Sequence, residues 1–131
     1  MQVELVSPER ITFSGVAETV RVRTVGGGEI QFLEGHTPFI GVLQVSAAKV
    51  VSADGDQIFA IHQGFVQVSG EKVTILSDVS ERKEDIDVPR AEAAKSKAKA
   101  AFEADPTDTE AQFALRRAEV RLGVASGELP A

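Results

Sequence analysis

The side chains best suited to chemistry lie in a short stretch, IDVPRA, that begins at Ile86. Asp87 and Arg90 place a carboxylate and a guanidinium three positions apart, where a helix is expected to begin. The free N–H groups and the dipole of a helix N-terminus favour a bound anion. Spacing alone, however, favours a plainer interpretation, in which Asp87 caps the helix and Arg90 pairs with a nearby acid. Three arginines of a later predicted helix would converge on the same place if the chain folded back: Arg116, Arg117 and Arg121.

Other motifs carry weaker signals. The stretch GGGEIQFLEGH, from Gly26 to His36, lacks the lysine and the Ser/Thr of a Walker motif and precedes no predicted helix. It is therefore typical of a flexible connection between strands rather than a nucleotide loop. His36 and His62 are the only histidines, and the chain has no cysteine that could join either of them as a metal ligand. Because Ser, His and Asp occur in no nucleophile-elbow context, we expect no metal site, no catalytic residue and no enzyme activity of the chain by itself.

The first 80 residues consist of short stretches in which apolar and polar residues alternate. Strict alternation predicts strands with one buried face and one solvated face. The pairs Asp54-Gly55 and Ser69-Gly70 predict tight hairpin turns. With no helix predicted between the strands, residues 1–85 are expected to form an antiparallel β-sandwich or flattened barrel. The clearest alternating stretches are residues 2–5, 20–23, 66–68 and 73–75.

The remaining residues, 86–131, have the composition of helices. Asp87 is a suitable N-cap and Pro89 fits a first helical turn, while Pro106 ends the first helix. Thr107, followed by Glu110 three positions later, forms a capping-box signature for a second helix. That helix is expected to run to about Leu122, with Gly123 as its stop. So short a link between the helices predicts an antiparallel two-helix hairpin.

The predicted helices present stripes of small side chains. Such stripes let two helices approach closely, but each side chain buries little area at about 25 cal/mol per Å2. Isolated helices of this length are marginal in water. We therefore expect the hairpin to need the sandwich or a partner, and to be able to leave one for the other. The stripes consist of Ala91, Ala94, Ala98 and Ala101 in the first helix, and of Ala111, Ala114, Leu115, Ala118 and Leu122 in the second.

Length and composition describe an ordinary globular chain. Its 131 residues fit one domain, or one domain with an appendage, and 43% of them are hydrophobic. The net charge of −6 argues against nucleic acid as a partner. No apolar stretch approaches the roughly 20 residues of a membrane span, and no signal peptide is expected. The absence of cysteine suits a reducing compartment.

Three stretches resemble the ATP synthase epsilon subunit family. GEIQFLEGHTPFIGVL, residues 28–43, resembles the signature GELGILPGHAPLL of that family. GFVQVSGEKVTILSD, residues 64–78, is similar to its glycine-led strand pair, and IDVPRA resembles its I/L-D-x-x-R-A motif. The three occur in the family's order and span essentially the whole chain. Gln31, Glu34 and Thr37 depart from the usual glycine, proline and alanine of the first signature.

The resemblance implies a non-catalytic rotor subunit of a proton-translocating ATP synthase, peripheral on the cytoplasmic face of the bacterial inner membrane. Its sandwich would bind the gamma subunit and face the c-subunit ring, with Glu29 and His36 toward that ring. Its hairpin would be permissive when folded, and when extended along the stalk toward the alpha and beta subunits it would inhibit ATP hydrolysis. No cofactor would be required. A regulatory ATP would hold the folded form through Glu81, Ile86, Asp87, Arg90 and Ala91, with the arginines Arg116, Arg117 and Arg121 as further candidates.

Two other functions stay open: a free-standing ATP-sensing binding module that uses the same hairpin, and a small β-sandwich enzyme. A rotor subunit should co-purify with gamma and a large membrane complex. Recovery only as a free monomer would favour the sensor.

Overall fold

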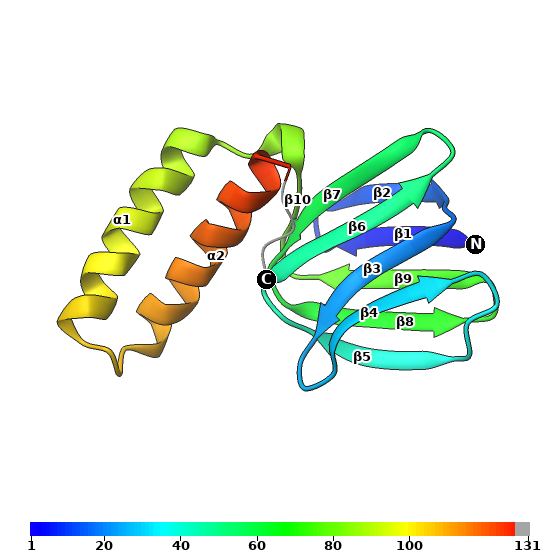
Figure 1. Ribbon diagram of the computed structural model, residues 1–131, viewed down its shortest axis with the longest axis horizontal. Helices are drawn as coiled ribbons and strands as arrows, with labels where there is room; N and C mark the ends of the chain where they lie inside the picture. The colour runs from blue at the N-terminus through cyan, green and yellow to red at the C-terminus, as the bar shows by residue number, and fades with distance from the viewer. Residues whose placement is uncertain (128–131) are drawn as a thin grey trace.

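The computed structural model describes residues 1–127 and has two parts, a β-sandwich and a helical hairpin at one side of it (Figure 1). The last four residues of the segment predicted to be a hairpin lie outside the described residues. In chain order the elements are β1 (Gln2–Ser7), β2 (Arg10–Val16), β3 (Thr19–Thr24), β4 (Gly28–Leu33), β5 (Phe39–Leu43), β6 (Ser46–Ser52), β7 (Gly55–Ile61), β8 (Gly64–Ser69), β9 (Lys72–Ser77), β10 (Ser80–Arg82), the 3-10 turn η1 (Lys83–Asp85), α1 (Val88–Ala104) and α2 (Thr109–Ala125).

The strands form one continuous sheet that folds over on itself. Its order is β10-β7-β6-β3-β5-β8-β9-β1-β2, and β4 pairs with β3 beside this path. The pairs are antiparallel except that β1 and β9 run parallel, which is possible because most of the domain separates them and no tight turn joins them. Side chains bring the two ends together: Thr12 Oγ1 and Ser80 Oγ lie 2.6 Å apart, and Arg82 Nε donates to the Thr12 carbonyl at 2.9 Å. The predicted sandwich or flattened barrel is confirmed.

The two predicted hairpin turns, at Asp54-Gly55 and Ser69-Gly70, are confirmed. Gly55 and Gly70 have φ angles of 119° and 61°, values that favour glycine, and they join β6 to β7 and β8 to β9. The stretch from Gly26 to His36, expected to be a flexible connection, instead contains strand β4, which pairs with β3. The reason is its own alternation, since Phe32 is fully buried in the core while Gln31 and Leu33 face outward.

The main core lies between the layers of the sandwich. All 15 of its buried residues come from residues 3–75, which means that no helical side chain belongs to it. Val3, Leu5, Phe32, Phe59 and Ile75 are fully buried in this core. The sandwich therefore carries its own hydrophobic interior.

The hairpin forms as predicted, except that α2 begins and ends at other residues. Asp87 caps α1 and accepts a hydrogen bond from Arg90 N at 3.1 Å. The cap of α2, however, is Asp108 and not Thr107, because the Thr107 hydroxyl is held by Asp105 Oδ1 at 2.6 Å. Helix α2 also continues through Gly123 to Ala125. The glycine with a left-handed φ of 85° is Gly127, beyond the cap at Ser126.

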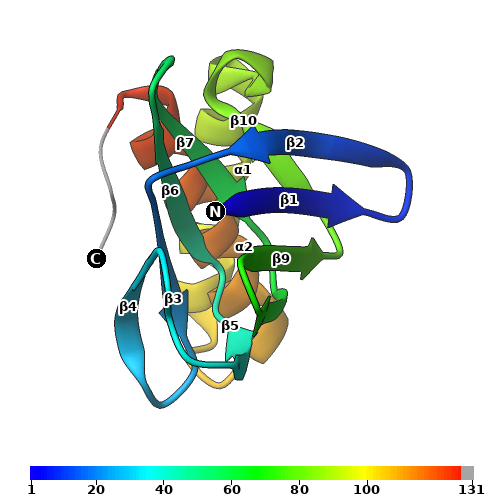
Figure 2. The ribbon, with the colours of Figure 1, turned by 90° about the vertical axis from the view of Figure 1, so that its right-hand side faces the viewer.

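Helix α2 docks the hairpin on the sandwich, and α1 lies on the far side of α2 (Figure 1). Figure 2 shows both helices behind the strands, on one side of them. The expectation that the hairpin buries only small side chains is wrong in one respect: Val120 and Val124 are fully buried against Val45 and Ala60. The predicted alanine stripes are also only partly buried: Ala91 and Ala98 of α1 and Ala111 and Ala118 of α2 are buried, whereas Ala94 and Ala101 are exposed.

Candidate functional site

A cavity of about 370 Å3 lies at the joint between the sandwich and the hairpin. Strand β10, η1, the first turns of α1 and the last turns of α2 provide its walls. A volume of this size is at the lower end of the range for small-molecule sites. The lining residues are Glu81, Asp85, Asp87, Arg90, Ala91, Ala94 and Arg121.

The α1 side of the cavity has the chemistry of an anion site. Asp87 caps the helix, and Pro89 in the first turn has no N–H to satisfy. Among the contacts of residues 1–127, no ion pair engages the Arg90 guanidinium, which is exposed at the cavity wall. Ala91 and Ala94 continue the wall with small side chains. The first turn of α1 thus offers a helix dipole, an arginine and room for a ligand.

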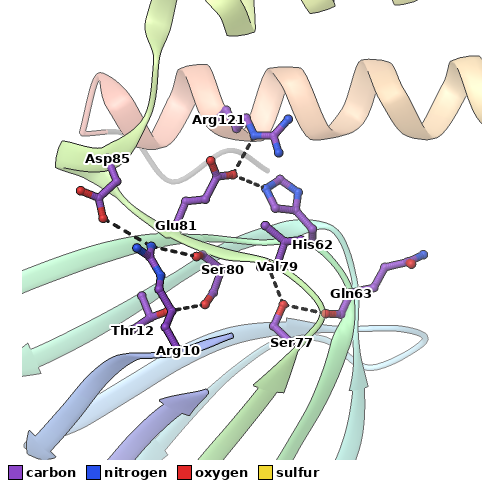
Figure 3. A network of polar contacts seen from close by, with 10 residues as sticks. All are labelled: Arg10, Thr12, His62, Gln63, Ser77, Val79, Ser80, Glu81, Asp85 and Arg121. Atoms are coloured by element: carbon purple, nitrogen blue, oxygen red, sulfur yellow. Dashed lines mark hydrogen bonds and ion pairs between the residues drawn. The ribbon is translucent and has the colours of Figure 1, made fainter. Parts of the chain in front are cut away.

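The sandwich side is built on the Glu81 carboxylate, shown in Figure 3. Its Oε1 atom lies 2.7 Å from His62 Nε2 and 2.7 Å from Arg121 Nε. Burial by itself raises the pKa of this carboxyl, but the hydrogen bonds and charges of His62 and Arg121 outweigh burial and lower the pKa to about 2. Glu81 is therefore ionised at neutral pH and ties β10 to α2.

A second set of polar contacts, made by Arg10, lies beside the cavity. Arg10 Nη2 lies 3.4 Å from Asp85 Oδ2 and donates to the Ser80 carbonyl at 3.4 Å (Figure 3). These contacts join β2 to β10 and to η1. The segment that leads into α1 is thus held to the sandwich by polar contacts.

The structure brings together five of the eight residues predicted for ATP: Glu81, Asp87, Arg90, Ala91 and Arg121 line one cavity. Ile86 packs instead beside the apolar cluster of Val120 and Val124. Arg116 Nε donates to the Val45 carbonyl at 3.2 Å, and Arg117 Nη2 pairs with Glu110 Oε1 at 2.9 Å. The expected convergence thus involves Arg121 but not Arg116 or Arg117, because α2 turns the latter two toward other faces.

Glu29 and His36 lie away from this cavity. Glu29, on β4, is exposed and pairs with Arg21 and Arg23 at 3.5 Å each. His36, in the loop after β4, packs edge to face on Phe32, with ring centroids 4.8 Å apart. Its Nδ1 atom lies 2.7 Å from the Thr37 carbonyl oxygen. Glu29 thus faces solvent, while His36 also contributes to packing.

A much larger groove, of about 950 Å3, crosses the sandwich and reaches α2. Its floor is mostly apolar. Phe65 and Val42 remain 54% and 50% exposed, although both are strand residues. Sequence reasoning missed this surface, but the signal is present, since β5 and β8 place apolar residues on both of their faces. The groove is lined by Val6, Ser7, Pro8, Val25, Val42, Leu43, Gln44, Val45, Gln63, Gly64, Phe65, Leu76, Ser77, Asp78, Phe113 and Arg116.

Neither of the described helices is both long enough and apolar enough to cross a membrane. Within residues 1–127, no three His, Asp or Glu side chains gather as a group that could hold a metal ion.

A β-sandwich with a two-helix hairpin docked at its side, and a charged cavity where they meet, defines a two-part class of protein. The sequence matches the β-sandwich domain of the ATP synthase Delta/Epsilon chain over residues 1–83, and the long α-helix domain of the same chain over residues 84–126. This chain belongs to the ATP synthase delta/epsilon family and is a non-catalytic subunit of that complex.

Individual relatives are similar to this chain along nearly its full length. The chain is 37% identical to the ATP synthase epsilon chain of Streptomyces avermitilis over 127 residues, covering 96% of this chain and 95% of the relative. It is 34% identical to the epsilon chain of Bacillus pumilus over 128 residues, covering 95% and 96%. A chain in a structure of the Euglena gracilis mitochondrial ATP synthase has the same fold, with a TM-score of 0.80 at 22% identity, covering 95% of this chain and 79% of that chain.

Proposed function

We propose that this subunit sits in the central stalk, couples proton flow to ATP synthesis through its sandwich, and restrains ATP hydrolysis through its hairpin. The observation that supports the regulatory part is the narrow attachment of the hairpin. The described contacts that hold α2 to the sandwich are one small apolar cluster, the pairing of Arg121 with Glu81, and the hydrogen bond from Arg116 Nε to the Val45 carbonyl; α1 lies beyond α2. An element attached in this way can occupy two positions, whereas one built into the main core could not leave it.

The two parts, residues 1–85 and 86–131, are proposed to be separable. The main core consists entirely of sandwich residues, so removal of the hairpin leaves it intact. The loss would uncover only Val45 and Ala60, together with the partly buried Ala47 and Ile58 beside them. The sandwich should therefore fold alone.

The apolar groove is proposed to bind gamma. Its exposed Phe65, Val42 and Leu76 form an apolar surface of the kind that marks a protein interface. A free-standing sensor would leave this surface in water, which favours a stalk subunit over the sensor. Glu29 and His36, on β4 and the loop after it, are proposed to face the c ring, and the extended hairpin would meet alpha and beta. The subunit would be peripheral, on the cytoplasmic face of a bacterial inner membrane, held there by the complex.

The cavity at the joint is proposed to bind a regulatory ATP that favours the docked hairpin. The donor set fits a nucleotide: Arg90 can bind a phosphate, and the carboxylates of Asp85 and Asp87 can accept from amino or hydroxyl groups of a nucleoside. Because both parts contribute to the walls, a bound ligand would prefer the docked state.

The ATP site is tested by calorimetric titration of the isolated chain. Arg90→Ala should weaken ATP binding at least tenfold, which corresponds to about 1.4 kcal/mol. Arg117→Ala is the matched control, since Arg117 pairs with Glu110 outside the cavity. Equal loss in both variants would indicate unspecific charge attraction, and unchanged affinity in Arg90→Ala would leave Asp87 and Arg90 as parts of a helix cap.

The stalk role is tested by truncation after Asp85. The truncated chain should fold, bind gamma and support ATP synthesis in the reconstituted complex, while restraint of ATP hydrolysis should disappear. Failure to assemble would make the hairpin a structural element and refute the switch. Recovery of the full-length chain only as a free monomer, with no affinity for gamma, would favour the ATP-sensing module.

A further inference from the structure

The outer face of the sheet carries a continuous row of apolar side chains, one from each of five neighbouring strands. Strand pairing places Val42 of β5 opposite Phe65 of β8, and Phe65 opposite Leu76 of β9. The row continues through Val6 of β1 to Ile11 of β2. Phe65 and Leu76 are 54% and 47% exposed, and Ile11 at the far end is 61% exposed. Because neighbouring strands lie about 4.8 Å apart, this apolar row is about 19 Å long.

The two flanks of the apolar row differ from it. On the side away from the hairpin, the next row across the strands holds the polar residues Gln67, Thr74 and Glu4, and Ile40 is its apolar member. On the side of the hairpin, Phe113 and Arg116 of α2 line the groove. The apolar row is therefore a narrow stripe between polar side chains and a helix.

Backbone hydrogen bonding determines what kind of segment can cover this stripe. Strands β8, β9 and β1 each pair with a strand on both sides, so this face of the sheet offers side chains and no free backbone groups. An extended segment lying across it would leave its own N–H and C=O groups without partners in an apolar groove. A helix satisfies these groups internally, and one side of an amphipathic helix matches a stripe. At 1.5 Å per residue, the row accommodates about 13 helical residues.

Gln63 lies at the end of the apolar row's central strand, in the turn that leads from β7 into β8. Its φ of 65° makes it the one non-glycine residue with a left-handed backbone among residues 1–127, a conformation that costs free energy. Ser77 Oγ lies 2.8 Å from its carbonyl oxygen, and Gly64 after it leaves no room for a Cβ, so this backbone is fixed. The exposed side chain lines the groove, points away from Glu81 and His62 (Figure 3), and has no hydrogen bond to its amide within the described part of the chain. Strained residues of this kind cluster at functional sites.

We propose that the apolar row seats one amphipathic helix of the gamma subunit, which runs across the strands, and that the Gln63 amide makes the polar contact that fixes the register of that helix. This inference rests on the proposed binding of gamma to the groove. A helix with an apolar residue opposite Gln63 would leave the amide buried and unpaired, which selects against other registers. Because the chain has a net charge of −6, basic side chains along the rims of the helix fit best.

The path of the helix is tested by cross-linking from the two ends of the row. The native chain has no cysteine, so Val42→Cys and Ile11→Cys, in two separate full-length chains, each take one photoreactive label. With purified gamma, both labels should capture residues of the same helix, about 13 positions apart. Captured residues in different segments of gamma, or close together in one segment, would overturn the proposed helix.

The direction of the row is tested by titration of gamma with variants of the full-length chain. Ile11→Ala should weaken gamma binding about tenfold. Ile40→Ala is the matched control, since Ile40 is a 73% exposed strand isoleucine that lies beside the row, and its affinity should equal that of the native chain. Equal losses in the two variants, or no loss in either, would overturn the row as the seat of the helix. No affinity of the native chain for gamma would instead refute the proposed interface itself.

The role of Gln63 is tested by two measurements on one variant. Gln63→Gly relieves the left-handed backbone, so its thermal melt should be at or above that of the native chain. Its affinity for gamma should nevertheless fall about fivefold, because the amide is lost. Gln67→Ala, exposed on the same strand but outside the groove, should leave the affinity unchanged. A lower melt with unchanged affinity in Gln63→Gly would make Gln63 a structural residue and overturn its part in binding.

Discussion

The strength with which the hairpin is docked can be tested at two valines. Val120 and Val124 are fully buried between α2 and the sandwich. The double variant Val120→Ala, Val124→Ala removes two methyl groups from each side chain. At about 0.8 kcal/mol per buried CH2 unit, each change weakens docking by about 1.6 kcal/mol, and the pair by about 3 kcal/mol. Because 1.4 kcal/mol is a factor of ten, opening of the hairpin should become about a hundredfold more frequent.

Amide hydrogen exchange measures this opening directly. Peptides from residues 111–125 should exchange about a hundredfold faster in the variant, while peptides from β1, β3 and β9 should keep their protection, since the main core contains no helical residue. Alanine is a better helix former than valine, so faster exchange could not be blamed on a weaker helix. Val16→Ala, at a strand position that is 72% exposed, is the matched control.

Two results would refute this reasoning. Unchanged exchange in α2 would mean that the valine cluster does not hold the hairpin. Equal loss of protection in the hairpin and the sandwich would mean that the two unfold together, and that the hairpin has no independent position.

Further expectations concern charge, the loop and the backbone. Because the pKa of Glu81 is lowered from 4.5 to about 2, its ionised carboxylate stabilises the fold fully above about pH 4.5, and this contribution is lost as the pH falls toward 2. The native chain should therefore lose its advantage over Glu81→Gln in free energy of unfolding between pH 4.5 and 2, as measured by denaturant titration. Alanine at both Glu29 and His36 should lower the thermal melt by only a few degrees, because one is exposed and the other makes edge contacts, but should reduce coupling in reconstituted vesicles; a collapsed melt would make both residues structural. Gly64→Ala should destabilise by more than about 2 kcal/mol, since the φ of Gly64 is 146° and a Cβ would collide with the Leu76 carbonyl oxygen. Gly26→Ala should cost about 1 kcal/mol, because the φ of Gly26 is 79° but a Cβ there would meet open space. Similar thermal melts for the two glycine variants would contradict this.

Local patterns were enough to predict the fold class. Alternation in stretches such as 20–23 and the turn pairs at Gly55 and Gly70 report on neighbours in the chain, and such neighbours decide strands and hairpins. The same holds for the cap at Asp87. Where two local signals competed, the sequence was ambiguous. Thr107 and Asp108 are both good caps, and Asp105 decided between them by holding the Thr107 hydroxyl.

The candidate site was predicted less completely, because it depends on contacts between distant segments. The motif around Asp87 and Arg90 was visible, but the pairing of Glu81 with Arg121 joins residues 40 positions apart. Which arginine of α2 reaches the cavity depends on how the helix is rotated, and Val120 and Val124 fix that rotation by packing on the sandwich. His62 gave no signal in the sequence beyond its residue type, since its importance comes from burial next to that ion pair.

The apolar contacts that dock the hairpin are compatible with the proposed switch, because their strength is comparable to the free energy that a bound ligand can supply. The two buried valines contribute about 3 kcal/mol to docking. A ligand that binds only the docked state adds about 0.4 kcal/mol at a concentration equal to its Kd, and about 2.7 kcal/mol at a hundredfold excess. The contribution of about 0.4 kcal/mol is too small to compensate for the loss of the valine contacts, whereas the contribution of about 2.7 kcal/mol nearly compensates for it. It follows that the proposed regulatory ATP can control the hairpin only if cellular ATP lies far above the Kd of the cavity, and, if the cavity does bind ATP, that saturating ATP should restore most of the docking lost in the double valine variant.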